Sequence, residues 1–320
     1  MNKKDLKIHI IGAGVSGLIA ARVLENHGFS PVIIEATDRV GGRVKTDLIG
    51  GYRLDHGFQV LLTAYPAAQK YLDYKALELQ KFLPGASIFL KNGQKLIGDP
   101  LRSPSLLFST LFSGIGTISD KIRILKLNLY LKKKSLTTIF AENEQTTHSY
   151  LTNLGFSEEI ITNFFKPFFS GIFLETKLET SSRMFEFVYK MFGEGHATLP
   201  KSGIEAIPKQ LLENLKTTTL KYNTKVETLK ETEITLKDGT CLKSDYTIIA
   251  TEASELVSNL KNQSTEWKSC VTLYFETDAR VITKKLIGLI SKPGTLVNNI
   301  FYNSSLDARI KPANELLSVT

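Results

Sequence analysis

The feature that most constrains this 320-residue sequence is a glycine pattern near its start. Residues 7–11, KIHII, form a short apolar run, and G-x-G-x-x-G follows at Gly12, Gly14 and Gly17, before a stretch of helical character over residues 18–25. In such a pattern the first glycine allows a tight turn, the second lets the backbone approach a pyrophosphate, and the third lets a helix pack closely on a strand. The sequence therefore predicts a Rossmann-like strand, turn and helix.

A second apolar run supports this interpretation. After Gly28, which we expect to end the helix, the segment PVIIE reads as a second strand whose last residue is Glu35. A carboxylate at this position accepts a hydrogen bond from a ribose hydroxyl and repels a 2′-phosphate. The pattern thus predicts a dinucleotide site that disfavours NADP, and leaves NAD and FAD open.

The segment TDRVGGRVKTD decides between them, because it adds a second glycine pair and two arginines directly after the second strand. Here the chain resembles the flavin-containing amine oxidase superfamily, which includes monoamine oxidases, protoporphyrinogen oxidases and phytoene desaturases. Members carry E-x-x-x-R-x-G-G-R, which Glu35, Arg39, Gly41, Gly42 and Arg43 match. The resemblance implies that the cofactor is FAD, with Arg43 and its neighbouring glycines along the pyrophosphate. For Arg39, a surface ion pair remains the alternative.

The resemblance extends to three later segments. It implies that a strand and turn over residues 50–61 return to the flavin ring, that the backbone of Val226 bonds the adenine, and that Ala250 and Thr251 lie beside the ribityl chain. Val226 reads equally well as a buried strand residue. The candidate cofactor-binding residues are Gly12, Gly14, Val15, Ser16, Gly17, Glu35, Ala36, Arg39, Gly41, Gly42, Arg43, Gly57, Phe58, Gln59, Val226, Ala250 and Thr251.

The expected fold class is α/β, with a Rossmann-like FAD-binding domain and an inserted, discontinuous α+β substrate domain. Residues 1–62 and 195–255 are predicted to build the FAD-binding domain, the latter with strands around an Asp238–Gly239 hairpin turn. Residues 63–194 read as helices and loops of the substrate domain, and residues 256–320 as strands of its sheet. Members of the superfamily normally continue with a further flavin-binding segment, and no part of residues 252–320 matches it.

A phenylalanine-rich stretch lies within the predicted helical part. Its sequence, NFFKPFFSGIFLETKLETSSRMFEFVYKMF, resembles desaturase-like members of the superfamily. Two interpretations apply: the rings line an apolar substrate tunnel, or they are core. The rings in question are Phe165, Phe168, Phe169 and Phe173.

The segment over residues 104–136 predicts a helix from Ser119 that is apolar on two sides. Ile118, Ile122, Leu125 and Leu129 fall on one side, and Ile124, Leu127 and Leu131 on the other. One interpretation packs the helix between two neighbours inside the substrate domain. The other predicts peripheral contact with a membrane, in which one face meets lipid and the nearby lysines meet anionic head groups.

Composition excludes several classes of function. The formal net charge of +8 is spread along the chain among acidic residues, so we expect no nucleic acid partner. The two cysteines, Cys241 and Cys270, are too few for a disulfide framework and indicate a reducing compartment, so we expect a cytoplasmic protein that is peripheral to the membrane if the second interpretation of the helix holds. The five histidines show no metal-ligand spacing.

Together these patterns predict an FAD-dependent oxidoreductase that transfers a hydride equivalent from a small-molecule substrate to flavin. The substrate is either apolar, such as a polyene or a lipid-like molecule, or an amine. No catalytic residue stands out. The alternative is a truncated or non-catalytic flavin-binding relative with a structural or regulatory role.

Overall fold

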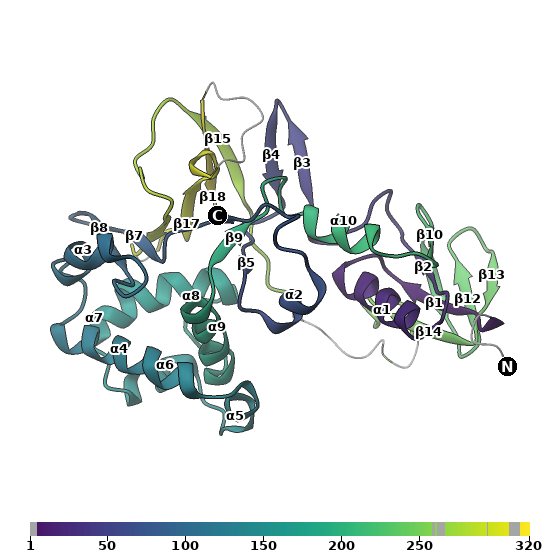
Figure 1. Cartoon of the computed structure of the whole chain (residues 1–320), viewed down its shortest axis with the longest axis horizontal. Coiled ribbons are helices and arrows are strands. Elements are labelled where there is room, and N and C mark those ends of the chain that lie inside the picture. Colours follow the sequence, from purple (N-terminus) through teal and green to yellow (C-terminus); the bar gives the residue numbers. More distant parts are fainter. Residues whose placement is uncertain (1–4, 258–259, 261–265, 293, 307–313) are drawn as a thin grey trace. The chain divides into compact units, whose positions relative to one another are not determined.

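A computed structural model describes residues 5–257, 260, 266–292, 294–306 and 314–320. The predictions for segments 1–62 and 256–320 include residues 1–4, 258–259, 261–265, 293 and 307–313, which lie outside the described residues. Contacts within the chain divide it into two compact units (Figure 1). Unit 1 contains residues 1–47, 70–78 and 202–267, and unit 2 contains residues 48–69, 79–201 and 268–320.

Unit 1 is built on a parallel sheet with the strand order β10-β2-β1-β14. Its central strand β1 is buried at all four residues, as expected for a parallel strand covered on both faces. The bounds of the four strands are Ile8–Ile11 for β1, Val32–Ile34 for β2, Thr219–Lys221 for β10 and Tyr246–Ile249 for β14. The predicted β1 and β2 are confirmed, and β10 was not predicted.

Helix α1 (Val15–Asn26) follows β1 and packs against α10 (Ala206–Glu213). It buries Gly17, Leu18 and Ala21 on one face. Gly28, with a φ of 84°, ends the turn that follows the helix, as predicted.

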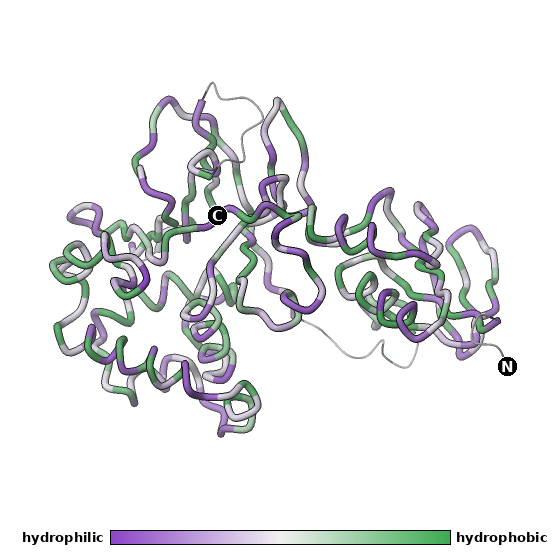
Figure 2. Tube along the Cα trace, viewed as in Figure 1, coloured by the Kyte–Doolittle hydropathy of each residue, from purple (hydrophilic) through white to green (hydrophobic). Residues whose placement is uncertain are grey.

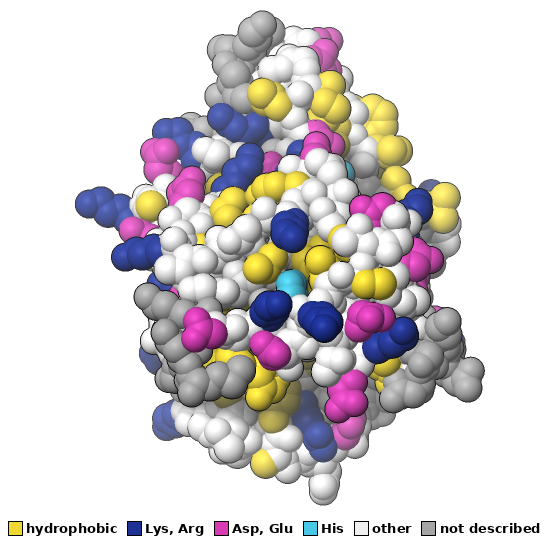
Figure 3. Space-filling model, turned by 90° about the vertical axis from the view of Figure 1, so that its right-hand side faces the viewer, with side chains coloured by type: hydrophobic (Ala, Val, Ile, Leu, Met, Phe, Trp, Pro, Cys, Tyr) yellow, Lys and Arg dark blue, Asp and Glu magenta, His cyan; other side chains and the backbone are white. Residues whose placement is uncertain are grey.

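A separate antiparallel sheet contains β11 (Val226–Leu229), β12 (Glu233–Leu236) and β13 (Cys241–Lys243), with the expected hairpin turn before β13. On the face of the molecule in Figure 3, Lys and Arg side chains lie among Asp and Glu rather than in one stripe.

Unit 2 contains a six-stranded sheet with the order β15-β18-β17-β16-β7-β8. Only the β16–β7 pair is parallel. The strand bounds are Gly85–Leu90 for β7, Gly93–Gly98 for β8, Leu273–Thr277 for β15, Ile287–Ile290 for β16, Asn299–Tyr302 for β17 and Glu315–Val319 for β18. Strands β15, β16, β17 and β18 fall within residues 256–320, which were predicted as strands of this sheet.

The prediction of helices and loops over residues 63–194 is wrong for residues 80–98. They form β6 (Gln80–Lys81) and the hairpin of β7 and β8, whose turn at Gly93 has a φ of 117°. The hairpin is anchored by parallel pairing of β7 with β16, about 200 residues later in the chain. Such a distant partner leaves no local signal in the sequence.

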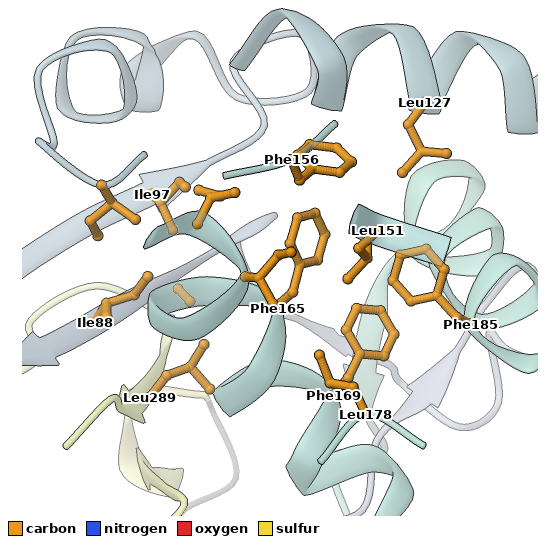
Figure 4. Packing of buried hydrophobic residues seen from close by; sticks show 14 of the residues in the cluster. Ile88, Ile97, Leu127, Leu151, Phe156, Phe165, Phe169, Leu178, Phe185 and Leu289 are labelled. Carbon is orange, nitrogen blue, oxygen red and sulfur yellow. The ribbon is translucent and has the colours of Figure 1, made fainter. Parts of the chain in front are cut away.

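Helices follow this hairpin and cover the sheet. Figure 4 shows Phe165, Phe169 and Phe185 of the helices packed together, with Ile88 and Leu289 contributed by the strands. The bounds are Leu107–Leu111 for α3, Ile118–Lys133 for α4, Leu136–Ala141 for α5, Thr147–Asn153 for α6, Glu158–Ile160 for α7, Lys166–Phe173 for α8 and Ser182–Glu194 for α9. Phe165 and Phe169 are fully buried, as the core interpretation expects, and Phe168 and Phe173 are partly buried and pack against the same cluster.

Helix α4 is not sandwiched between two apolar neighbours, so the first interpretation of this segment is wrong. It buries Leu127 and Leu131 in the core of unit 2, but Ile118 and Ile122 on the opposite face are exposed. Hydrophobic and hydrophilic residues alternate along the helices of unit 2 (Figure 2). Among the described residues, no helix combines the length and apolar character needed to cross a membrane.

The units depart from the predicted domain boundaries at several points. Residues 48–62 belong to unit 2, because β5 (Leu61–Leu62) pairs with β9 (Ala197–Leu199) and because the Asp55 carbonyl accepts a hydrogen bond of 2.8 Å from the Tyr274 hydroxyl. Strand β9 itself places residues 197–199 in unit 2 rather than in the FAD-binding domain. The two other short elements at this boundary are the hairpin of β3 (Thr46–Ile49) and β4 (Tyr52–Asp55), and helix α2 (Pro66–Tyr71).

Residues 70–78 join unit 1, although they were predicted as substrate domain. The Gln210 side chain of α10 accepts a hydrogen bond from the Asp73 amide at 2.9 Å and donates one to the Asp73 carbonyl at 3.0 Å. Arg22 of α1 donates to the Tyr71 carbonyl at 2.7 Å. Because these side chains belong to α1 and α10, the hydrogen bonds attach residues 70–78 to the helices of unit 1.

Candidate functional site

Two of the three glycines in the first motif are required by the fold itself. Gly12 has a φ of 102°, a conformation that strains other residues, and its amide donates to the Ile34 carbonyl at 2.8 Å. A Cβ at Gly17 would lie 2.0 Å from the Gly12 carbonyl oxygen. The chain therefore needs Gly12 for the turn between β1 and α1, and Gly17 for close packing of α1 on that turn.

Gly14 differs from both. Its φ of −67° and ψ of 174° suit any residue, and a Cβ there would meet no protein atom within 4 Å. The residue is the N-cap of α1, yet no side chain caps the helix. The protein thus leaves open space beside the amides of Val15, Ser16 and Gly17, at the positive end of the helix dipole. This is the arrangement that receives a phosphate group.

The second glycine pair packs on the first loop. The Gly41 amide donates to the Ala13 carbonyl at 2.9 Å, and Gly41 forms a bridge with Gly14. Gly41 and Gly42 have φ values of 116° and 59°, and a Cβ on Gly42 would lie 3.4 Å from the Gly14 Cα. Two motifs more than 20 residues apart in the sequence therefore present their backbones at one place in unit 1.

Glu35 holds the loop from the end of β2. Its carboxylate is buried and accepts from the Ala13 amide at 2.7 Å, the Thr37 amide at 2.9 Å and the Thr37 hydroxyl at 2.8 Å. A carboxylate offers about four lone-pair positions, so one remains for a ribose hydroxyl. Ala36 is exposed beside it. Glu35 thus fits the predicted role and also has a structural one that the sequence did not indicate.

The two arginines of the second motif have different surroundings. Arg39 pairs with Asp47 at 2.7 Å and lies 3.6 Å from a carboxylate oxygen of Glu205, at the N-terminus of α10. The ion-pair alternative thus describes Arg39. Arg43 is exposed, and its guanidinium lies 5.5 Å from the centre of the Trp267 ring. The place of Arg43 along the phosphates stays a prediction.

Ala250 and Thr251 lie at the glycine turn, directly after β14. The Ala250 amide donates to the Ile11 carbonyl at 2.9 Å, and the Ala250 oxygen would be 3.1 Å from a Cβ on Gly12. Thr251 is exposed. The structure therefore brings both residues beside the first motif.

Val226 and residues 57–59 are placed differently. The Val226 side chain is buried with Ile11 and Ile34, as the strand interpretation expects, and its backbone lies at the start of β11. Gly57, Phe58 and Gln59 belong to unit 2. Gly57 has a φ of 78°, and the Gln59 side chain donates to the His56 carbonyl at 2.8 Å.

Sequence reasoning missed the residues that complete the edge of this site. The Glu35 amide donates to Lys221 of β10, the Thr224 amide donates to the Glu35 carbonyl, and the Asn223 amide donates to the Thr37 carbonyl, at 2.8 to 2.9 Å. Asn223 has a φ of 51°, which asparagine tolerates better than most residues. The signal in the sequence is the Asn–Thr pair that follows a threonine-rich run, a pattern typical of a turn after a strand.

Comparison with known proteins agrees with this geometry. A model of the family described as flavin containing amine oxidoreductase matches residues 15–319. Protoporphyrinogen oxidase 2 of Arabidopsis thaliana is 27% identical over 168 residues, which make up 52% of this chain and 32% of that protein. An L-amino-acid oxidase of Sistrurus catenatus edwardsii is 36% identical over 104 residues, 32% of this chain and 20% of that protein. The matches thus span about a third or less of these curated relatives.

Solved structures share the fold over almost the whole chain. An oxidoreductase from Methanosarcina mazei superimposes with a TM-score of 0.73 at 18% identity, covering 98% of this chain and 78% of that one. A putrescine oxidase superimposes with a TM-score of 0.66 at 16% identity, covering 98% and 74%. Because the family model matches nearly the entire sequence, the chain belongs to the flavin containing amine oxidoreductase family, whose cofactor is FAD.

Proposed function

We propose that this protein is an FAD-dependent oxidoreductase that removes a hydride equivalent from a C–H bond of an apolar substrate. The observation that carries the proposal is the open space at Gly14, beside a helix N-terminus that no side chain caps. The chain gains nothing structural from a glycine at this position, whereas a pyrophosphate needs the bare backbone. Bound FAD supplies the redox chemistry, because its flavin ring accepts two electrons and a proton from the substrate.

The residues of unit 1 bind and orient the cofactor. The amides of Val15 and Ser16 donate to the phosphates, and Arg43 adds a positive charge beside them. Glu35 accepts from a ribose hydroxyl while it holds the Ala13 amide in place. Because the glycine turn is already held by hydrogen bonds to Ile34 and Glu35, the phosphate site is formed before the ligand arrives.

The proposed substrate class rests on three aromatic rings in unit 2. Phe58, in the segment expected to approach the flavin, packs against Phe301 at 5.7 Å and Phe82 at 6.3 Å between ring centres. Phe82 and Phe301 are buried and lie 4.6 Å apart. Phe58 is only partly buried, so its ring offers an apolar edge that the two buried rings hold in place, which suits a polyene or lipid-like substrate. Oxidation of an amine is the competing outcome, since relatives include an L-amino-acid oxidase and a putrescine oxidase.

A visible spectrum tests whether the chain binds flavin. The full chain, purified with added FAD, is expected to show flavin absorbance that dithionite bleaches without oxygen and that air restores. A colourless protein under these conditions contradicts the assignment of FAD to this chain.

Anaerobic mixing with two kinds of probe then tests the substrate class. The FAD-loaded chain is mixed with a conjugated polyene in detergent micelles and, separately, with putrescine or L-leucine. We expect bleaching of flavin absorbance by the polyene alone. Bleaching by an amine alone replaces the apolar substrate with an amine. A flavin that dithionite reduces but that no probe reduces favours the non-catalytic alternative.

A further inference from the structure

Helices α3 and α4 of unit 2, which are labelled in Figure 1, carry exposed apolar side chains. We call this set of residues the α3–α4 face. The exposed fraction is 74% for Phe108, 74% for Phe112 and 71% for Ile118, unusually high for such large apolar side chains. The members of the face are Leu107, Phe108, Leu111, Phe112, Ile118, Ile122, Leu125 and Leu129.

The fold of unit 2 does not need this face. Helix α4 is fixed from its other side by Leu127 and Leu131, which are buried in the core. Its N-terminus is closed by a capping box between Thr117 and Asp120. The exposed residues of α4 recur at spacings of four, three and four, so they form one stripe along the helix. With the helix anchored on one side, this stripe is held outward.

The two helices are tied together at the face. The Lys121 side chain of α4 donates to the Leu111 carbonyl of α3 at 2.7 Å. This bond holds the C-terminal end of α3 near the first turn of α4. The apolar residues of both helices therefore lie in the same part of unit 2.

Along α4 the exposed charges have a single sign, whereas Glu158 and Glu159 at the start of α7 are exposed and acidic. Within residues 101–133 the only acidic residue is Asp120, which is fully buried and hydrogen-bonded to Thr117 and Ser157. Lys126, Lys132 and Lys133 are exposed on α4. On a helical wheel at 100° per residue, they lie on both flanks of the apolar stripe. Long lysine side chains at such positions extend past apolar groups to reach an anionic surface.

We propose that the α3–α4 face docks on an anionic lipid bilayer. Phe108, Phe112 and the stripe of α4 enter the boundary between head groups and acyl chains, while the flanking lysines contact lipid phosphates and carboxylates. A second copy of this chain fits less well, because a twofold interface brings two basic faces together. The proposal does not depend on redox activity, although an apolar substrate dissolves in the same bilayer.

Co-sedimentation of the full chain with lipid vesicles tests this docking. Vesicles of phosphatidylcholine with phosphatidylserine are compared with phosphatidylcholine alone, at low and high salt. We expect binding to the anionic vesicles that falls as salt rises. Replacing Lys126, Lys132 and Lys133 with glutamine is expected to weaken binding on the order of 100-fold, about fivefold for each charge.

Two further variants test whether binding depends on the α3–α4 face itself. Lys225, Lys237 and Lys243 are exposed in unit 1, and their replacement by glutamine removes the same charge without affecting the α3–α4 face, so binding is expected to persist. Phe108→Ala with Phe112→Ala is expected to reduce binding to anionic vesicles while leaving thermal unfolding unchanged, because both rings are exposed. Absence of vesicle binding overturns the proposal, and so does an equal loss in both lysine variants. A dimer in light scattering that Phe108→Ala with Phe112→Ala dissociates assigns the face to a second copy instead.

Discussion

The N-termini of helices α1 and α4 differ in whether a side chain accepts hydrogen bonds from the first turn. The first amides of any helix lack partners within the helix. In α4, the Thr117 hydroxyl accepts from the Asp120 amide at 3.1 Å, and the Asp120 carboxylate accepts from the Thr117 amide at 2.8 Å. In α1, the N-cap is Gly14 and no side chain accepts from the first turn. One helix caps its own first turn, and the other has the uncapped first turn that the proposed phosphate site requires.

The same contrast extends to the neighbours of α4. Helices α5, α6, α7 and α9 begin at serine or threonine residues whose hydroxyls accept from their own first turns, namely Ser135, Thr146, Ser157 and Ser181. Unit 2 therefore caps these helices with protein atoms. Helix α1 instead has a glycine at its N-cap with open space beside it, which suits the proposed phosphate site, and this difference is readable in the sequence.

The largest expected effect comes from removing the carboxylate that closes α4. Asp120→Ala deletes hydrogen bonds from the amides and hydroxyls of both Thr117 and Ser157 to a fully buried group. We expect unit 2 to lose about 3 kcal/mol of unfolding free energy. Urea unfolding measures the loss. An unchanged midpoint contradicts the view that α4 depends on its own cap.

Gly17→Ala is expected to have the next largest effect, in unit 1. The added Cβ would lie 2.0 Å from the Gly12 carbonyl oxygen, so α1 must move away from the turn, at a cost of about 2 kcal/mol. The matched control is Gly14→Ala, whose Cβ meets open space and whose backbone angles suit alanine. Thermal unfolding without FAD compares the two. If Gly14→Ala destabilises unit 1 as much as Gly17→Ala does, Gly14 is also needed for packing, and the different roles given to the two glycines are wrong.

The smallest expected effect is on acid stability. Burial by itself raises the pKa of the Asp120 carboxyl, but the hydrogen bonds from Ser157 and Thr117 outweigh burial and lower the pKa below its ordinary value. A lowered pKa means that this carboxylate stabilises the fold above about pH 4 and that the contribution is lost as the pH falls through the folded-state pKa.

Urea midpoints between pH 6 and pH 3 check this dependence. Glu25 in unit 1 also has a lowered pKa, because its hydrogen bonds to residues 216–218 outweigh the effect of burial. The difference between wild type and Asp120→Asn therefore isolates Asp120. The wild type is expected to lose more stability than the variant below pH 4, and parallel curves contradict the role given to the carboxylate.

The sequence predicted most of unit 1, because local chemistry determines it. The apolar runs of β1 and β2, the helix between them and the separate roles of Gly12, Gly14 and Gly17 follow from spacing alone. The partners of Arg39 could not be predicted in the same way. Asp47 and Glu205 lie 8 and 166 residues away in the sequence, and only the fold brings Glu205 near.

Unit 2 was less predictable, because its sheet depends on distant pairs. Strand β7 pairs with β16 across about 200 residues, and both contain glycine, which weakens a strand signal. The rings around Phe165 read as either core or tunnel, since burial depends on which helices lie opposite. Helix α4 was predicted correctly with two apolar sides, but only the structure shows that one side is exposed.

Gly14→Asp tests the proposal that the N-terminus of α1 is open for the phosphates of FAD. An aspartate at this N-cap has space for its side chain, accepts from the first-turn amides and places a negative charge where the pyrophosphate belongs. Titration of the flavin-free chain with FAD, followed by protein fluorescence, measures the dissociation constant. We expect binding to weaken on the order of 100-fold or more, while the unfolding free energy without FAD rises by a few tenths of a kcal/mol. Wild-type affinity for FAD in this variant contradicts the account.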